Sequence, residues 1–523
     1  MALSDGPAST VIRGVRLPRH DGAGGPGGPA PDAYGAGGAD APAAADTWDV
    51  TVRDGLIDRI VPSAQTPAPP GGAVVDADGR FLLPGLWDEH THMVQWALAM
   101  TRLDLSRAGS AAQVLDLVAA ALPADRTPVV GYGFRDAPWP DEPTRLALDQ
   151  VAGAVPVVLV SADLHCAWVN GAGAELLGVS TGTDGLVREG PWFAAMARLD
   201  EVTITGAETA LRRALPLLAA RGVVGVVDLE WADNITDWRE RLQHGPAPVR
   251  VEAGIYPDRL PQALAEGWRS GQEVPGTGGM LRVGPLKILS DGSLNTRTAL
   301  CREPYRSTTD APRVPGGGYG HREYEVAEMV DTVRRAHAGG ILTTIHAIGD
   351  LAVTAALDVF EATGVPGRIE HAQLVHPDDH ARFARLGVVA SVQPEHAMDD
   401  RDLAEQYWPD RTGWCFPLAA LHRAGATIRF GSDAPVAPLD PWSAISAAVT
   451  RSRDGRPPWH PEQALGVAAA LAASTRGRTH LTAGHPADLV LTEVDPCTAD
   501  GADLRAMPVW ATMVAGRWTH GPG

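Results

Sequence analysis

The stretch GPLKILSDGS, residues 284–293, contains Lys287, the only lysine in this chain of 523 residues. Apolar residues flank it on both sides, and a near-continuous apolar run is typical of a parallel strand buried on both faces. Lysine normally keeps its charged head group in water. A buried lysine can lose its proton and act as a nucleophile, whereas arginine stays protonated. We therefore expect a site that needs the Lys287 amine. The alternative is that this one lysine is present by chance in a chain whose composition favours arginine.

Seven further apolar runs resemble this stretch, and Ala- and Leu-rich helical segments lie between them. They are FLLPGLWDEHTH (81–92), GVVGVVDLE (222–230), VRVEAGIYP (249–257), ILTTIHAIGD (341–350), RIEHAQL (368–374), GVVASVQP (387–394) and TIRFGSDAP (427–435). Eight short apolar strands that alternate with helices are the pattern of an α/β fold, the (β/α)8 TIM barrel. The sequence therefore predicts one barrel of parallel strands.

Short β-rich segments with alternating apolar and polar residues open and close the chain, as expected of antiparallel strands. They predict a composite β-sandwich built from both chain termini, with residues 1–83 and 480–523 on either side of a barrel at 84–479. Between His92 and the second barrel strand lie about 130 residues, where one β/α unit needs about 30. We interpret the excess, about 103–205, as an inserted subdomain after the first barrel strand.

The composition limits the partners and the compartment. A formal net charge of -19 argues against nucleic acid or an anionic membrane as a partner. We find no secretory signal and no run of about 18 apolar residues, and the four cysteines lie far apart without a C-x-x-C pair. These features predict a cytoplasmic protein with reduced thiols, and they leave a homodimer open. Residues 21–46 are low in complexity and predict a mobile loop.

Side chains of metal-ligand type recur where the predicted barrel strands end. They are His90, His92, Lys287, His346, His371 and Asp433. His90 and His92 enter the barrel together, because residues i and i+2 of a strand point to the same side. Catalytic groups of such barrels lie at the carboxyl ends of the strands. A lone histidine on an apolar run is more often a core or surface residue, but four histidines and an aspartate at strand ends are hard to assign to packing.

A centre with two divalent ions would give Lys287 a function. Two cations a few ångströms apart need a bridging anion, and a protonated lysine would only repel them. A neutral lysine amine reacts with carbon dioxide to give a carbamate, which is a carboxylate on a long stem that can bridge both ions. Arginine cannot do this.

Several motifs together resemble the amidohydrolase superfamily, most closely its YtcJ-like (amidohydrolase 3) branch, which includes N-substituted formamide deformylases. The motifs are LPGLWDEHTHM (83–93), DLHCAWVN (163–170), GPLKILSDGSLNTRTAL (284–300), HAIGD (346–350), IEHAQLVHPDD (369–379), FGSDAPV (430–436) and the closing GHPADLVL (484–491) with MVAGRW (513–518). The resemblance runs nearly end to end. It departs at Glu89, where a small residue is commoner, and at Asn295, where glycine is usual; neither is a ligand position.

The resemblance implies metal-dependent hydrolysis of an amide-type C–N bond in a small-molecule substrate. Carried across, His90 and His92 bind one metal, His346 and His371 bind the second, and Lys287 matches the bridging carbamylated lysine. Asp433 matches the last-strand aspartate. A metal-bridging hydroxide would attack the carbonyl, and Asp433 would take its proton and pass it to the leaving amine. We expect zinc, because the site is rich in histidine; Mn²⁺, Fe²⁺, Co²⁺ and Ni²⁺ stay open.

Substrate contacts are expected from the insertion and from loops near the strand ends. The motif DLHCAWVN brings His165, Trp168 and Asn170 together, a mixed polar and aromatic group suited to orienting a small molecule. Its alternative is a local helix cap with a packed tryptophan. Weaker candidates are Tyr132, Gln373 and His396.

Two other functions compete with the hydrolase. A mononuclear deaminase of the same superfamily would need a glutamate soon after the histidine of the fifth strand, where HAIGD offers only Asp350, and it leaves Lys287 unexplained. A catalytically inactive barrel acting as a binding protein would be expected to have lost ligands, and none is missing. About two ions per chain would favour the hydrolase, one the deaminase and none the binding protein.

Overall fold

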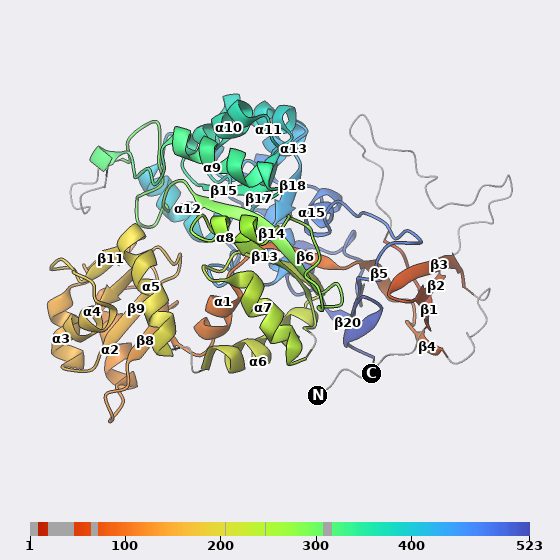
Figure 1. Ribbon diagram of the computed structural model, residues 1–523, viewed down its shortest axis with the longest axis horizontal. Helices are drawn as coiled ribbons and strands as arrows, with labels where there is room; N and C mark the ends of the chain where they lie inside the picture. Colours follow the sequence, from red (N-terminus) through yellow and green to blue (C-terminus); the bar gives the residue numbers. More distant parts are fainter. Residues whose placement is uncertain are drawn as a thin grey trace.

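The computed structural model describes most of the chain (Figure 1). The described residues are 9–18, 47–63, 72–203, 206–245, 247–306 and 316–522. The loop predicted at 21–46 lies outside them, as does the end of the predicted insertion at 204–205. None of the helices in the described ranges is long and apolar enough to cross a membrane.

An eight-stranded parallel sheet forms the centre of the described chain, in the order β18-β17-β16-β15-β14-β13-β12-β6. Its strands are β6 (Leu86–Thr91), β12 (Val223–Asp228), β13 (Arg250–Ile255), β14 (Leu281–Leu289), β15 (Thr343–Ala347), β16 (Gly367–His371), β17 (Val389–Val392) and β18 (Ile428–Phe430). They coincide with the eight apolar runs of the sequence. The predicted α/β barrel is confirmed.

The sheet nearly closes on itself where the first and last strands meet. Thr91 forms a parallel bridge with Ala434, and the backbone N–H of Asp433 donates to the carbonyl of His90 at 2.7 Å. Gly431 permits this approach, because a Cβ there would lie 2.7 Å from the backbone nitrogen of His90. The first and last strands therefore bring their chemistry-bearing ends side by side.

Burial explains the choice of residues in these elements. Every residue of β6, β12 and β15 is buried, as both faces of a covered parallel sheet require. The surrounding helices are buried to different degrees. In Val326–Ala338, Met329, Val333 and Ala336 are buried, a spacing that places them on one helical face, whereas eight of the ten residues of Pro441–Thr450 are buried.

Helices lie around the barrel sheet (Figure 1). They are α1 (Met93–Ala99), α6 (Ala207–Ala219), α7 (Asn234–Gln243), α8 (Leu260–Ala265), α9 (Val326–Ala338), α10 (Asp350–Thr363), α11 (His380–Leu386), α12 (His396–Tyr407), α13 (Leu418–Arg423), α14 (Pro441–Thr450), α15 (Val467–Ser474) and α16 (Gly501–Arg505).

Between β6 and β12 the chain forms a separate five-stranded sheet, ordered β11-β10-β9-β8-β7, on one side of the barrel (Figure 1). Its elements are β7 (Leu103–Asp104), α2 (Ala111–Ala121), β8 (Val129–Phe134), α3 (Arg145–Ala152), β9 (Val157–Ser161), β10 (Cys166–Val169), α4 (Gly171–Leu177), β11 (Leu186–Arg188) and α5 (Glu189–Thr203). We call this segment the insertion. Alternate residues of β9 and β10 enter two cores, one with α2 and α3 and the other with α4 and α5.

Two four-stranded sheets lie on the other side of the barrel (Figure 1). One contains β1 (Ser9–Val15), β2 (Trp48–Arg53), β3 (Leu56–Pro62) and β4 (Ala73–Asp76); the other contains β5 (Phe81–Pro84), β19 (Leu489–Thr492), β20 (Val509–Val514) and β21 (Arg517–His520). Antiparallel pairing of β5 with β19 joins the two ends of the chain. Buried residues of both sheets share one apolar cluster. The composite sandwich and the domain boundaries stay predictions.

Candidate functional site

Six side chains of metal-ligand type, from five of the barrel strands and the residues just after them, converge at one end of the barrel. His90 lies in β6 and His92 just after it, Lys287 in β14, His346 in β15, His371 at the end of β16 and Asp433 just after β18. All six line one cavity of about 540 Å³, which we call the central pocket. Their strands are parallel, so their carboxyl ends face the same mouth of the barrel.

Asp433 lies between the histidines of the first strand. One of its oxygens, Oδ1, is 3.3 Å from Nε2 of His90 and 3.2 Å from Nε2 of His92. Ligand atoms of His90, His371 and Asp433 all lie within 4.8 Å of one another. The rings of His346 and His371 are 4.5 Å apart between centroids. These side chains are therefore close enough to share ions.

Lys287 is 1% exposed. Among the described residues its amine is hydrogen-bonded to Nε2 of His90, at 3.1 Å, and burial lowers the pKa of the amine to about 8. Asp291, the nearest carboxylate in the sequence, does not pair with this amine. The carboxylate of Asp291 instead accepts hydrogen bonds from backbone N–H groups, including those of Leu300 and Gly349.

Glu370 is a partner of this site that sequence reasoning missed. It is fully buried in β16, and its Oε2 lies 2.9 Å from Nδ1 of His90. Its other oxygen accepts a hydrogen bond from Thr344 at 2.6 Å and lies 3.3 Å from Arg368. Burial alone would raise the pKa of Glu370, but Arg368 and His90 hold it well below its usual range. The signal was the carboxylate directly before His371 in the motif IEHAQ.

The protonation states of His90, His371 and Asp433 suit a metal centre. Burial, followed by the neighbouring Lys287, lowers the pKa of His90 to about 4, and burial also holds the pKa of His371 well below its usual range. Burial opposes ionisation of Asp433, but the nearby histidines His90 and His92 hold its pKa well below the usual range. Neutral imidazole and charged carboxylate are the forms that bind metal. Nδ1 of His371 is buried without a hydrogen-bond partner among the described residues, so the donor set fits divalent cations.

Backbone strain coincides with two of the predicted ligand positions. His371 and Asp433 have φ of 71° and 57°, in the left-handed region that residues with side chains seldom adopt. Such conformations persist where the surrounding structure fixes them, and they cluster at active sites.

The central pocket has an apolar wall on one side of the ligands. Its residues are Leu164, Phe193, Met196, Trp231, Tyr256 and Val436. Trp231 stacks on Tyr256 with ring centroids 4.6 Å apart and an angle of 13°, and Phe193 is 5.6 Å from Trp231. Trp231 and Tyr256 follow strands β12 and β13, whereas Phe193 belongs to the insertion. Barrel and insertion together therefore build an aromatic surface beside the ligands, which we call the aromatic wall.

A second cavity of about 420 Å³, the side pocket, shares Asp163, His165, His371, Asp433 and Val436 with the central pocket. Its further lining is mixed, with Leu294 and Ile348 beside polar and charged side chains such as Arg135, Gln373, His396, Asp399 and Asp400. Of the six ligand-type residues, His371 and Asp433 border both cavities.

Three of the predicted substrate residues line these cavities. His165 borders both cavities, and Gln373 and His396 border the side pocket. The amide of Gln373 donates to Asp400 at 2.9 Å. His396 begins helix α12, and its Nε2 is buried without a partner among the described residues.

The other three predicted substrate residues lie elsewhere, contrary to the sequence interpretation. Trp168 is completely buried in the core that the insertion's sheet forms with α2 and α3. The barrel residue Val436 packs against the core on the opposite face of that sheet, so Trp168 points away from the barrel. Asn170 caps helix α4, because its side chain accepts a hydrogen bond from the backbone N–H of Gly173. The same side chain accepts a hydrogen bond from the backbone N–H of Val157 in β9. Tyr132 donates its hydroxyl proton to the carbonyl of Ala162. The alternative, a helix cap with a packed tryptophan, describes Trp168 and Asn170.

Comparison with known proteins agrees with this site. The profile described as "Amidohydrolase family" matches residues 73–520. The chain belongs to the amidohydrolase family. This confirms the resemblance seen in its motifs and makes the protein a hydrolase by family.

Three relatives align with this amidohydrolase over most of their length. Protein LONG AFTER FAR-RED 3 of Arabidopsis thaliana is 26% identical, over 86% of this chain and 83% of the relative. The Bacillus subtilis protein named "Putative amidohydrolase YtcJ" is 25% identical, over 85% and 89%. N-substituted formamide deformylase of Arthrobacter pascens is 24% identical, over 86% and 90%.

A solved structure shares the fold of this amidohydrolase. It is that of an uncharacterized metal-dependent hydrolase from Pyrococcus horikoshii, with a TM-score of 0.73 and 23% identity, covering 94% of this chain and 99% of the other. At this identity the likeness shows the fold alone.

Glu370 should be needed to orient His90. In this amidohydrolase Glu370→Gln keeps the shape of the side chain but replaces the carboxylate that faces Nδ1 of His90 at 2.9 Å. Removing such a partner of a metal-binding histidine typically lowers metal affinity by about 10–100-fold. We expect Glu370→Gln to lower metal affinity by about that factor, measured in a competition titration with a chelator. Glu361→Gln, on the exposed face of α10, is the matched control. Unchanged affinity in Glu370→Gln would contradict the assignment.

Proposed function

We propose that the protein is a metal-dependent amidohydrolase that cleaves a C–N bond in an amide, a formamide or a related small molecule. The observation that carries this proposal is the convergence of four histidines, one aspartate and one buried lysine on the central pocket. Family membership supports hydrolysis. The name of the Arthrobacter relative, N-substituted formamide deformylase, supports the choice of bond.

We further propose that the site takes two divalent ions, with zinc as the expected metal. His90 and His92 would hold one ion, His346 and His371 the second, with Asp433 between the first-strand histidines. The Lys287 amine would attack carbon dioxide, forming an N–C bond and releasing one proton, and the resulting carbamate would join both ions. When bound, the ions would supply a water that ionises near neutral pH and would polarise the scissile carbonyl.

Asp433 is the proton carrier that we propose. Its Oδ1 lies within 3.3 Å of both first-strand histidines, and the residue borders both cavities. It would accept the proton that the attacking water loses and deliver it to the nitrogen of the leaving amine. His90 keeps its Nε2 directed toward Lys287 and Asp433 because Glu370 occupies the other side of its ring.

The competing functions leave more observations unexplained. A mononuclear deaminase needs a proton-shuttling carboxylate after His346, but Asp350 begins helix α10, where it accepts from the backbone N–H of Arg302, and it does not border either cavity. That function also gives no role to Lys287. A non-catalytic binding protein gives no reason to keep all six ligand-type side chains together.

A substrate screen tests the proposal. The metal-loaded protein is incubated with N-formyl, N-acyl, cyclic amide, carbamate and ester compounds, and the released amine, alcohol or acid is measured. We expect turnover of at least one N-formyl or N-acyl compound, lost on chelation and restored by metal. Ammonia release from an aminated heterocycle, with no amide cleaved, would favour the deaminase.

The aromatic wall should select substrates with a flat apolar group. Trp231 is 43% exposed and stacks on Tyr256, so Trp231→Ala removes contact area without opening the barrel core. We expect KM for an N-arylmethyl amide to rise by about 10-fold or more, since burying a large apolar side chain against a partner is worth roughly 1.5–3 kcal/mol. KM for an N-methyl amide serves as the internal control and should change little. An equal change for both compounds would contradict the assignment.

A further inference from the structure

His165 of the insertion is paired with a carboxylate deep in the molecule. Its Nδ1 lies 2.8 Å from Oε2 of Glu189, and both side chains are 12% exposed. The two residues flank strands β10 and β11 of the insertion, so the pair comes from outside the barrel.

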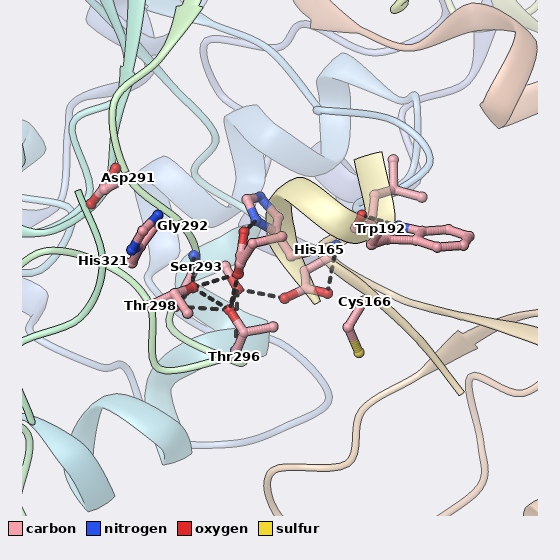
Figure 2. Close-up of polar contacts among 12 residues, drawn as sticks. His165, Cys166, Trp192, Asp291, Gly292, Ser293, Thr296, Thr298 and His321 are labelled. Carbon is pink, nitrogen blue, oxygen red and sulfur yellow. Dashed lines mark hydrogen bonds and ion pairs between the residues drawn. The ribbon is translucent and has the colours of Figure 1, made fainter. Parts of the chain in front are cut away.

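The barrel holds the carboxylate of this pair in place. Oε1 of Glu189 accepts hydrogen bonds from the hydroxyls of Thr296 at 2.7 Å and Thr298 at 2.5 Å, both on the loop that follows β14. Figure 2 shows these threonines gathered next to His165. A Cβ at Gly292 would lie 2.8 Å from Oε1 of Glu189 and would also collide with Thr298. The loop is therefore shaped around this carboxylate.

A second contact joins the same two parts. The hydroxyl of Ser293 donates to Oδ2 of Asp163 at 2.6 Å, and the other oxygen of Asp163 accepts from the hydroxyl of Ser161 at 2.5 Å and from the backbone N–H of His165 at 3.3 Å. Both the ring and the backbone of His165 are thus fixed relative to the strand that carries Lys287.

The free side of the imidazole faces the reaction site. His165 borders both cavities, and its ring centroid is 5.6 Å from that of His346. Since Nδ1 is engaged by Glu189, the nitrogen available to a substrate is Nε2. A carboxylate that receives two hydroxyl donors is an anion, and an imidazole beside it is favoured as the cation, in which both nitrogens donate.

We propose that His165 is a catalytic residue that donates a hydrogen bond from Nε2 to the substrate's carbonyl oxygen as negative charge develops there, and that Glu189 is its positioning residue. This inference rests on the proposed function. A donor aimed at the developing charge stabilises the transition state more than the bound substrate. Removing one such donor typically costs about 10²–10³-fold in kcat. The barrel would thus supply the metal ligands, and the insertion would supply the hydrogen-bond donor to the developing oxyanion.

His165→Asn separates a catalytic from a structural role. The asparagine amide can replace Nδ1–H as the donor to Glu189, so the contact between insertion and barrel is kept, but no group replaces Nε2. We expect kcat and kcat/KM to fall together by about 10²-fold or more, with metal content and thermal midpoint unchanged. A purely structural role predicts activity within about 3-fold of the parent, which would overturn the proposal.

Glu189→Gln tests the positioning role. It should lower kcat/KM by about 10–100-fold, the usual effect of a partner that orients a catalytic imidazole. When Glu189→Gln is combined with His165→Asn, kcat/KM should fall little further than in His165→Asn alone, because the two residues act as a unit. The matched control is His321→Gln, since His321 also pairs with a carboxylate, Glu323 at 3.0 Å, but on the exposed surface. Fully additive losses, or an equal loss in His321→Gln, would contradict the assignment.

A binding measurement separates this inference from the proposed function. Methylphosphonate, a tetrahedral anion, and acetamide, a neutral planar amide, are titrated into the metal-loaded parent and His165→Asn proteins by calorimetry. We expect the variant to lose affinity for methylphosphonate but not for acetamide. If the parent hydrolyses no compound of the screen, the proposed function fails while this comparison still reports on His165. Equal methylphosphonate affinity in an active parent and in the variant would overturn only the role of His165.

Discussion

Lys287→Arg should abolish turnover as completely as Lys287→Ala. Arginine retains a positive charge and a long stem, but it cannot form a carbamate, and its guanidinium would lie where the amine now faces Nε2 of His90 at 3.1 Å. We expect both variants to lose at least about 10³-fold in kcat/KM, the upper range for removal of one main electrostatic contributor. Steady-state kinetics on the substrate found in the screen measures the loss. Arg282→Ala, at an exposed position of the same strand, is the matched control.

Chemical rescue distinguishes a carbamate from a structural lysine. Lys287→Ala should regain part of its activity with a short carboxylic acid, which can occupy the vacated space and provide the missing carboxylate. Intact-mass or crystallographic analysis of the parent should find one added carbon dioxide on Lys287. A simple buried cation predicts the reverse: arginine tolerated better than alanine, and no response to added acid. An active Lys287→Arg protein would therefore contradict the carbamate.

Asp433→Asn should keep much of the metal but lose activity. Asparagine can still offer an oxygen to a cation, yet it cannot accept the proton of the attacking water. General acid–base groups contribute about 10²–10⁴-fold, so we expect kcat to fall by at least about 10²-fold. Elemental analysis should show that metal is retained. Asp440→Asn, a cap of helix α14 on the same segment, should leave kcat unchanged, because asparagine caps as well as aspartate.

A different result would change the assignment of roles at the last strand. If Asp433→Asn turns over within a few-fold of the parent, another group moves the proton. If instead the variant loses its metal together with its activity, Asp433 acts chiefly as a ligand. The protein would still be a metal-dependent hydrolase in both cases, but the proton path through Oδ1 of Asp433 would be wrong.

The barrel and the convergence of its six ligand-type side chains could be predicted because both follow from local patterns. Strands buried on both faces must be apolar, so runs such as GVVGVVDLE are visible without any tertiary knowledge. A polar residue that ends such a run lies at the mouth of the barrel by geometry. His346 and His371 were found in this way, and Lys287 was conspicuous as the only lysine.

Contacts between distant elements could not be predicted in the same way. Glu370 is a buried carboxylate in β16, and its contacts with His90 of β6 and Thr344 of β15 join strands that are far apart in the sequence. The motif DLHCAWVN places Asp163, Leu164 and His165 at the central pocket but Trp168 and Asn170 in the insertion's interior. Sequence alone could not tell which face turns toward the barrel.

The aromatic wall was also missed, although a signal existed. Trp231 and Tyr256 come directly after the second and third barrel strands, at the same mouth as the ligands. Phe193 could not have been added from sequence, since it arrives on helix α5 of the insertion.

Metal dependence of amide hydrolysis is the central claim, and a metal titration of activity tests it most directly. The protein is stripped with a chelator, supplied with bicarbonate and titrated with Zn²⁺, while release of the amine from an N-substituted formamide is followed. We expect no turnover in the stripped protein and a rise that saturates near two ions per chain, the number that the six ligand-type side chains can hold. Saturation near one ion would contradict the two-metal site, and turnover that is unaffected by stripping and by added metal would contradict the claim itself.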